Sequence, residues 1–109
     1  MSKIDQHEDY LEQWIRDNAA AMLGCKLEQT AMVETNEEYQ AGEAPLATSN
    51  VVVQVSESDM ERISEALDED YFGFLAPFLM DDVISECWDT SVYIDEAENQ
   101  ITFEITYFT

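Results

Sequence analysis

The stretch SVYIDEAENQITFEITYF, residues 91–108, has the alternating pattern of a β-hairpin. Two runs with an apolar side chain at every second position are separated by the polar tetrapeptide EAEN, residues 96–99. Because successive side chains of a strand point to opposite faces, we predict that one face of the hairpin is buried. Its members are Val92, Ile94, Ile101, Phe103, Ile105 and Tyr107, with Tyr93, Asp95, Thr102, Glu104 and Thr106 outside.

Two further strands are predicted nearer the N-terminus. NVVVQV, residues 50–55, places three valines on one face, and the segment from Cys25 to Glu34 also has a period of two. The polar segment 35–50 between them contains one Gly and one Pro, which indicates a connection. Together with the hairpin these segments predict an antiparallel sheet of about four strands, in which residues 50–55 pair with the hairpin.

The first two helices are predicted from apolar residues spaced three and four apart. One helix covers residues 4–23 and ends at Gly24, a residue that tolerates the left-handed conformation of a helix terminus. The second begins at a capping box formed by Ser58 and Glu61.

A break at Gly73 separates the second helix from a third, which is predicted to run from Pro77 in its first turn to about Trp88. The order helix, two strands, two helices, two strands predicts one α+β domain over residues 1–109. Its helices would pack on one face of the sheet.

The charge balance is extreme for a chain of 109 residues. There are 4 Lys and Arg against 25 Asp and Glu, a formal net charge of -21 at pH 7, while a hydrophobic content of 46% suffices for one core. Direct binding to DNA, RNA or an anionic membrane needs cationic surface and is therefore excluded. No segment is long and apolar enough for a signal peptide or a membrane span, so we predict a cytoplasmic protein with a basic protein partner.

Catalytic and metal-binding motifs are not evident. The segment DEDYFG, residues 68–73, resembles the start of a calcium loop, but Phe72 and Leu79 stand where that loop requires oxygen ligands. His7 is the only histidine and is predicted to be a solvated surface residue. Cys25 and Cys87 are predicted to be reduced, buried thiols. We therefore expect no enzymatic activity, no cofactor and no metal.

The remaining signal is the pattern of the negative charge. Solubility alone needs a net charge of only about 2 to 8, and adaptation to high salt fits poorly with the preference for Glu and Ile, although a basic partner bound by ordinary contacts stays open. On the first helix, Asp5, Glu8, Asp9 and Glu12 place four carboxylates over about 12 Å, one per about 3 Å. One strand of B-DNA carries a charge about every 3.4 Å, so this spacing favours mimicry of nucleic acid.

Residues 66–88, ALDEDYFGFLAPFLMDDVISECW, combine acidic and large apolar side chains. Charge steers a partner over long range, but specificity needs apolar anchors inside the charged rim, and some aromatic residues of this segment would supply them. The predicted partner-binding residues are Asp5, Glu8, Asp9, Glu12, Asp68, Glu69, Asp70, Tyr71, Phe72, Asp81, Asp82, Glu86, Asp95, Glu96, Glu98 and Glu104.

In size, charge and lack of catalytic residues the chain resembles the acidic DNA-mimic inhibitors that phages and mobile elements use against restriction and CRISPR systems. The resemblance is one of composition over the whole chain and involves no motif. It implies a compact anti-restriction or anti-CRISPR protein that occupies the nucleic-acid channel of a host enzyme or nuclease, often as a homodimer. Small acidic immunity proteins against nuclease toxins look similar, so an immunity or regulatory protein that binds a basic partner outside its nucleic-acid site is the alternative.

Overall fold

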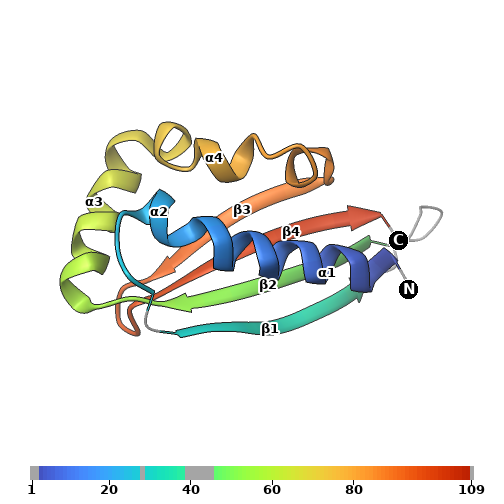
Figure 1. Cartoon of the computed structure of the whole chain (residues 1–109), viewed down its shortest axis with the longest axis horizontal. Coiled ribbons are helices and arrows are strands. Elements are labelled where there is room, and N and C mark those ends of the chain that lie inside the picture. The colour runs from blue at the N-terminus through green and yellow to red at the C-terminus, as the bar shows by residue number, and fades with distance from the viewer. Residues whose placement is uncertain (1–2, 28, 39–45, 109) are drawn as a thin grey trace.

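The computed structural model describes the backbone of residues 3–27, 29–38 and 46–108, and the side chains of residues 6–27 and 46–108. One antiparallel sheet contains the strands in the spatial order β1-β2-β4-β3, and helices cover one of its faces (Figure 1). The strands are β1 (Gln29–Glu38), β2 (Leu46–Gln54), β3 (Asp89–Asp95) and β4 (Gln100–Phe108). The predicted α+β class and antiparallel sheet are confirmed.

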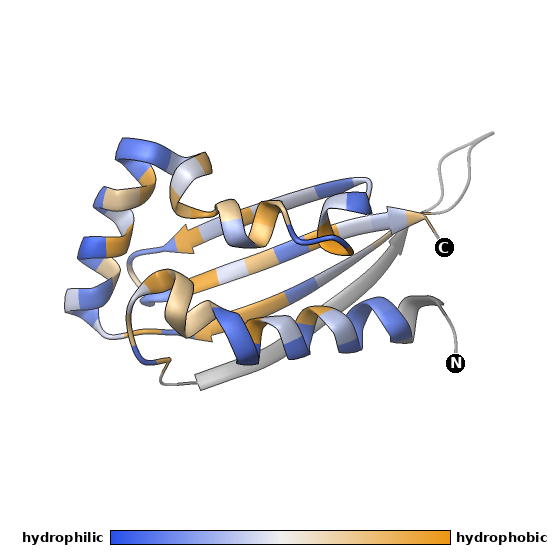
Figure 2. Ribbon diagram, turned by 45° about the horizontal axis from the view of Figure 1, so that its top comes forward, coloured by the Kyte–Doolittle hydropathy of each residue, from blue (hydrophilic) through white to orange (hydrophobic). Residues whose placement is uncertain are grey.

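The first helical segment consists of α1 (Lys3–Trp14), a π-helical turn η1 (Ile15–Ala19) and α2 (Ala20–Leu23). Gly24 ends it with a φ of 69°, as the sequence predicted. Its apolar side faces the sheet, and its hydrophilic side faces outward (Figure 2). The π turn was not predicted. In an α-helix, side chains four residues apart point in directions that differ by about 40° around the helix axis. A π turn has more residues per turn and offsets this difference, which helps Ile15, Ala19 and Leu23 all to face the core.

The C-terminal hairpin has the predicted faces. Ile101, Phe103, Ile105 and Tyr107 are buried on the helix-covered face, and Val92 lies opposite Phe103 in the register of β3 and β4. The expected pairing of residues 50–55 with the hairpin is also confirmed, because β2 pairs with β4 along its whole length. On β2, β3 and β4 the other face of the sheet carries polar and partly exposed side chains, as is common for antiparallel sheets.

Two predictions about the N-terminal strands are wrong. No strand begins at Cys25: its N–H donates to Ala20 O over 3.1 Å, which makes this residue part of the helix terminus, and β1 begins at Gln29. The connection 35–50 is also too long, because β1 continues to Glu38 and β2 already begins at Leu46. Polar residues of β2 are tolerated because Thr48 bonds Thr106 across the open face, over 3.0 Å, and the hydroxyl of Ser49 bonds that of Tyr107, over 2.9 Å.

The second helix, α3 (Glu57–Phe74), has its N-cap two residues before the predicted one. The N-cap is Ser56, whose Oγ accepts a hydrogen bond from Asp59 N over 3.2 Å. Ser58 instead lies inside the first turn. The predicted break at Gly73 is displaced as well, because the non-helical residue is Asp70, with φ −154° and ψ 80°.

The predicted helix from Pro77 to Trp88 does not form as one element. The helix α4 (Ala76–Leu79) has four residues, and after a turn the chain makes a single 3-10 turn, η2 (Ile84–Glu86). The cause is Asp81, whose Oδ1 accepts hydrogen bonds from Val83 N and Ile84 N, both over 3.0 Å. This side-chain cap offers the backbone an alternative to the continuing helix.

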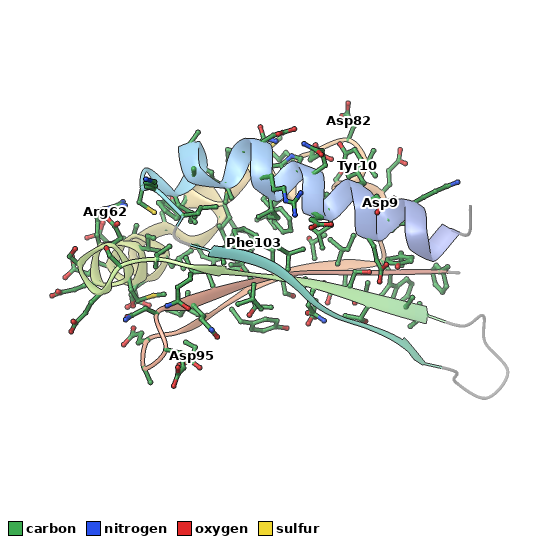
Figure 3. The ribbon with its side chains drawn as sticks, turned by 60° about the horizontal axis from the view of Figure 1, so that its bottom comes forward. Asp9, Tyr10, Arg62, Asp82, Asp95 and Phe103 are labelled. Carbon is green, nitrogen blue, oxygen red and sulfur yellow. The ribbon has the colours of Figure 1, made fainter. Side chains whose placement is uncertain are left out.

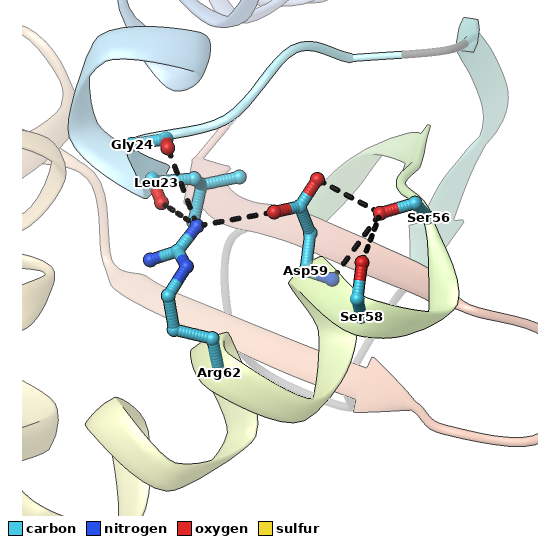
Figure 4. A network of polar contacts seen from close by, with 6 residues as sticks. All are labelled: Leu23, Gly24, Ser56, Ser58, Asp59 and Arg62. Atoms are coloured by element: carbon cyan, nitrogen blue, oxygen red, sulfur yellow. Dashed lines mark hydrogen bonds and ion pairs between the residues drawn. The ribbon is translucent and has the colours of Figure 1, made fainter.

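One arginine joins the end of α2 to the start of α3 (Figure 4). The Arg62 guanidinium donates to Leu23 O over 2.9 Å and to Gly24 O over 3.3 Å, and it lies 3.6 Å from Asp59 Oδ1. It therefore satisfies carbonyl groups that a helix terminus leaves without partners. Among the described residues, no helix is long and apolar enough to cross a membrane.

Candidate functional site

The predicted contact residues lie in three groups rather than on one surface. The first group is on α1 and in segment 80–88, the second is near the non-helical residue in α3, and the third is in the turn between β3 and β4. Asp9 and Asp82 lie on the helix side of the sheet, and Asp95 lies away from them (Figure 3). Glu104 is on the open face of the sheet, and the side chain of Asp5 lies outside the described residues.

The first group forms a continuous surface, which we call the helical acidic face: the exposed side of α1 together with residues 80–88. Two contacts join these segments: the Tyr10 hydroxyl donates to the Asp81 carboxylate over 3.0 and 3.1 Å, and His7 Nδ1 lies 3.9 Å from Cys87 Sγ. Burial, then the hydrogen bond to Asp81 and the charges of Asp81 and Asp82, raise the pKa of Tyr10. Asp81 is therefore a structural residue, since it also caps η2, while Asp82 beside it is exposed.

Few of the carboxylates meet a cation. Within the described residues there are two ion pairs, Arg16 with Glu12 at 2.6 Å and Arg62 with Asp59 at 3.6 Å. Glu12, one of the predicted phosphate mimics on α1, is thus neutralised by its own helix. Six of the predicted acidic contact residues make no hydrogen bond or ion pair through their side chains within the described part of the chain: Asp9, Asp68, Glu69, Asp82, Glu86 and Glu98.

The second group is shaped by the break in α3. The Asp70 Oδ1 accepts a hydrogen bond from Gly73 N over 3.0 Å, and a Cβ at Gly73 would clash with the Asp70 carboxylate. The turn so formed exposes three quarters of the Phe72 side chain. Tyr71 packs edge to face on the Phe72 ring, with centroids 5.4 Å apart, and its hydroxyl accepts a hydrogen bond from Val92 N over 3.1 Å. Phe72 is therefore available to a partner, whereas Tyr71 belongs to the fold.

The third group is partly used by the fold. The Asp95 Oδ1 accepts from Glu98 N over 3.2 Å, and Glu96 accepts from the Ser64 hydroxyl over 2.5 Å. Beside them is an open depression of about 270 Å³, whose rim includes Glu57, Glu61 and Glu65 of α3. We did not predict this acidic row, although its spacing of four residues is the signal for side chains on one side of a helix.

Exposed apolar side chains accompany the charge on the helical acidic face. Trp88 is 64% exposed and Met80 is 76% exposed, and Tyr10 and Val83 are also exposed. The Trp88 ring packs edge to face on Phe108, with centroids 5.0 Å apart. We did not predict that Trp88 or Met80 would be exposed, because both lie in a segment expected to form a helix against the core.

The histidine and the cysteines differ from expectation. His7 is half-buried rather than solvated, with its ring stacked on Tyr107 at 4.1 Å. Both cysteines are free and half-buried, and burial, followed by the charge of Asp59, raises the pKa of Cys25 against the opposing effect of Arg62. Within the described residues, no three His, Cys, Asp or Glu side chains are placed to hold a metal ion.

Glu104 is a half-buried carboxylate on the open face of the sheet. Burial is the main cause that raises its pKa, the charge of Asp89 adds to this effect, and a hydrogen bond with Tyr93 opposes it. Its environment differs from that of the exposed acids on the helical acidic face.

Comparison with family models, curated proteins and solved structures found no match for this chain. Function is therefore inferred from the surface described above: exposed carboxylates that meet no cation among the described residues, placed around exposed aromatic and aliphatic side chains.

Proposed function

We propose that the protein is an acidic inhibitor that occupies the basic DNA- or RNA-binding site of a host defence or nucleic-acid-processing protein in the cytoplasm. The observation that carries this proposal is that few of the described surface carboxylates are neutralised by Lys or Arg residues of the same chain. Asp9, Asp82 and Glu86 of the helical acidic face have no ion pair or side-chain hydrogen bond within the described residues. A surface of this kind attracts a basic groove over long range.

The dimensions of the molecule support mimicry of a duplex. A net charge of -21 distributed along a longest dimension of 45 Å amounts to one negative charge per about 2 Å. Double-stranded DNA carries one negative charge per about 1.7 Å of its axis. A groove built for a duplex would therefore meet a similar linear charge density on this protein.

The exposed apolar side chains supply the selectivity for one partner that charge alone does not give. A polyanion attracts any basic groove, and selectivity comes from anchors that lose their water on binding. Trp88 and Met80 lie in the same segment as Asp82 and Glu86, so that charge and anchors occur together. This combination favours recognition of one partner over general stickiness to basic proteins.

Displacement from immobilised DNA tests the proposal. Proteins of a bacterial host extract are bound to double-stranded DNA on cellulose, and the acidic protein is then applied. A mimic releases its partner, because both compete for one site, and the released protein is identified by mass spectrometry. An immunity or regulatory protein that binds elsewhere would instead be retained on the column through its partner, and that outcome overturns mimicry.

Two matched triple variants locate the contact. Asp9→Asn, Asp82→Asn and Glu86→Gln remove three charges from the helical acidic face, while Glu61→Gln, Glu65→Gln and Glu98→Gln remove three from other exposed positions. We expect the first set to weaken displacement at least about tenfold and the second less than about threefold, since grouped contacts act together. Equal effects would show that this face is not the contact surface.

A further inference from the structure

A small cleft lies between the start of α1, residues 83–88 and the end of β4, with a volume of about 200 Å³. His7 and Tyr107, whose rings are stacked 4.1 Å apart, line it together with Trp88 and Phe108, which meet edge to face. Glu86 contributes a carboxylate to the same lining. The volume is below the range of about 300 to 1,000 Å³ typical of small-molecule pockets, so the cleft suits a single side chain.

The aromatic wall of the cleft is exposed to an extent that the fold does not require. Trp88 is 64% exposed and Phe108 is 40% exposed, whereas the other tryptophan, Trp14, is 8% exposed within the core. Exposed aromatic residues next to one another, with a charged rim, are typical of interaction sites. The aromatic faces here offer a flat surface on which a planar group can stack.

The charge of the cleft selects a cation. Glu86 is exposed and forms no ion pair or side-chain hydrogen bond within the described residues, and both arginines are used elsewhere. Arg16 pairs with Glu12, and Arg62 bonds the end of α2. Nothing in these contacts neutralises Glu86, and the net charge of -21 repels an anionic occupant.

Among cations, the guanidinium group fits best. It is planar, stacks on aromatic faces and forms paired hydrogen bonds with a carboxylate, whereas an ammonium group is a strongly hydrated point charge. We propose that this cleft binds an arginine side chain of the partner, with the guanidinium stacked on Trp88 and paired with Glu86. The inference rests on the proposed function in one respect, namely that the partner presents a basic surface.

Two peptides of equal charge test this assignment on the full chain. The probes are four Gly-Arg repeats and four Gly-Lys repeats, both acetylated and amidated, and binding is measured by calorimetry and by Trp fluorescence. General attraction to the acidic surface is the same for both peptides. Stacking should make the arginine peptide bind about 3- to 30-fold more tightly, with a change in the emission of Trp88.

The variants remove the two contacts separately. Trp88→Ala leaves the charge unchanged, and we expect it to weaken the arginine peptide to the level of the lysine peptide, while Trp88→Phe retains part of the preference. Glu86→Gln should weaken the arginine peptide more than Glu98→Gln, which removes the same charge elsewhere. Tyr93→Ala is the aromatic control, because Tyr93 is 54% exposed on the open face of the sheet near acidic residues.

Equal affinity for the two peptides, or an unchanged affinity of Trp88→Ala, would overturn the assignment. Circular dichroism verifies that each variant folds. If Trp88→Ala does not fold, the smaller loss expected of Trp88→Phe still tests the assignment. The two proposals fail separately. Arginine preference without displacement from DNA contradicts the mimic alone, and displacement without arginine preference contradicts the cleft alone.

Discussion

Arg62 shows how a chain with few cations uses one of them for its own fold. Its guanidinium bonds two carbonyl groups at the end of α2 and lies near Asp59 at the start of α3, so a single side chain fixes the relative position of two helices (Figure 4). Arg16, by contrast, pairs with Glu12 within one exposed turn. The two arginines have the same charge, but we expect Arg62 to contribute more to the stability of the fold than Arg16.

We predict that Arg62→Ala lowers the free energy of unfolding by about 1 to 2 kcal/mol, because it removes charge-assisted hydrogen bonds that are partly shielded from water. The melting temperature should fall by about 5 to 10 °C. Arg16→Ala is the matched control, because it removes the same charge from an exposed pair worth only about 0.3 to 0.5 kcal/mol. Thermal unfolding followed by circular dichroism checks both, and equal losses would contradict the role given to Arg62.

Glu104 makes stability depend on pH. Because its pKa is raised above the ordinary value of 4.5, the folded state binds this proton more tightly than the unfolded state. Stability therefore falls as pH rises above 4.5 through the folded-state pKa and stays lower at neutral pH. We predict that Glu104→Gln is more stable than the parent at pH 7, by about 2 °C in melting temperature, with a weaker decline between about pH 4 and pH 7.

The control for this prediction is Glu98→Gln, which removes the same charge from an exposed turn. General relief of repulsion would raise both variants equally. Only a larger gain for Glu104→Gln supports the burial of this carboxylate, and equal melting curves would count against it.

At the scale of elements, the start of α3 depends on one hydroxyl. Ser56 caps the helix, whereas Ser58 lies two residues further on with its hydroxyl 3.3 Å from that of Ser56. We predict that Ser56→Ala lowers the free energy of unfolding by about 1 kcal/mol and that Ser58→Ala lowers it by less than about 0.5 kcal/mol. Urea unfolding of the two variants distinguishes them, and a larger loss for Ser58→Ala would restore the cap position expected from the sequence.

Some elements of the fold can be predicted from the sequence and others cannot. The hairpin and the first helix follow from periodic apolar residues, because burial of one face fixes both structure and register. Segment 76–88 does not follow, because Asp81 bonds the backbone of η2 and the hydroxyl of Tyr10, which is distant in sequence. A periodic pattern carries no record of such tertiary contacts.

For the candidate site, the sequence predicts the excess of acidic residues but not which carboxylates are available. Asp81 and Asp82 are neighbours in sequence, yet one is held by three hydrogen-bond donors and the other has none within the described residues. The exposure of Trp88 also depends on the end of the short helical turns before β3, which no local pattern marks. Availability is a property of the folded chain.

At the scale of the whole molecule, self-repulsion is the main consequence of a charge of -21. Raising NaCl from about 0.1 M to about 1 M shortens the Debye length from about 10 Å to about 3 Å. We predict that the melting temperature at pH 7 then rises by about 5 °C or more. Near the isoelectric point of about 4.1 the net charge vanishes and the rise should disappear, and a salt response that is independent of pH would contradict this account.

The hydroxyl of Tyr71 has a consequence for self-association. β3 is an outer strand of the sheet, and an outer strand with free N–H groups can recruit a strand from another chain and begin aggregation. Val92, at the middle of β3, donates its N–H to Tyr71 instead, so a helix residue occupies the position that a foreign strand would need. In a protein that exposes large aromatic side chains such as Phe72 and Trp88, this protected edge and mutual repulsion both favour dispersed molecules over aggregates.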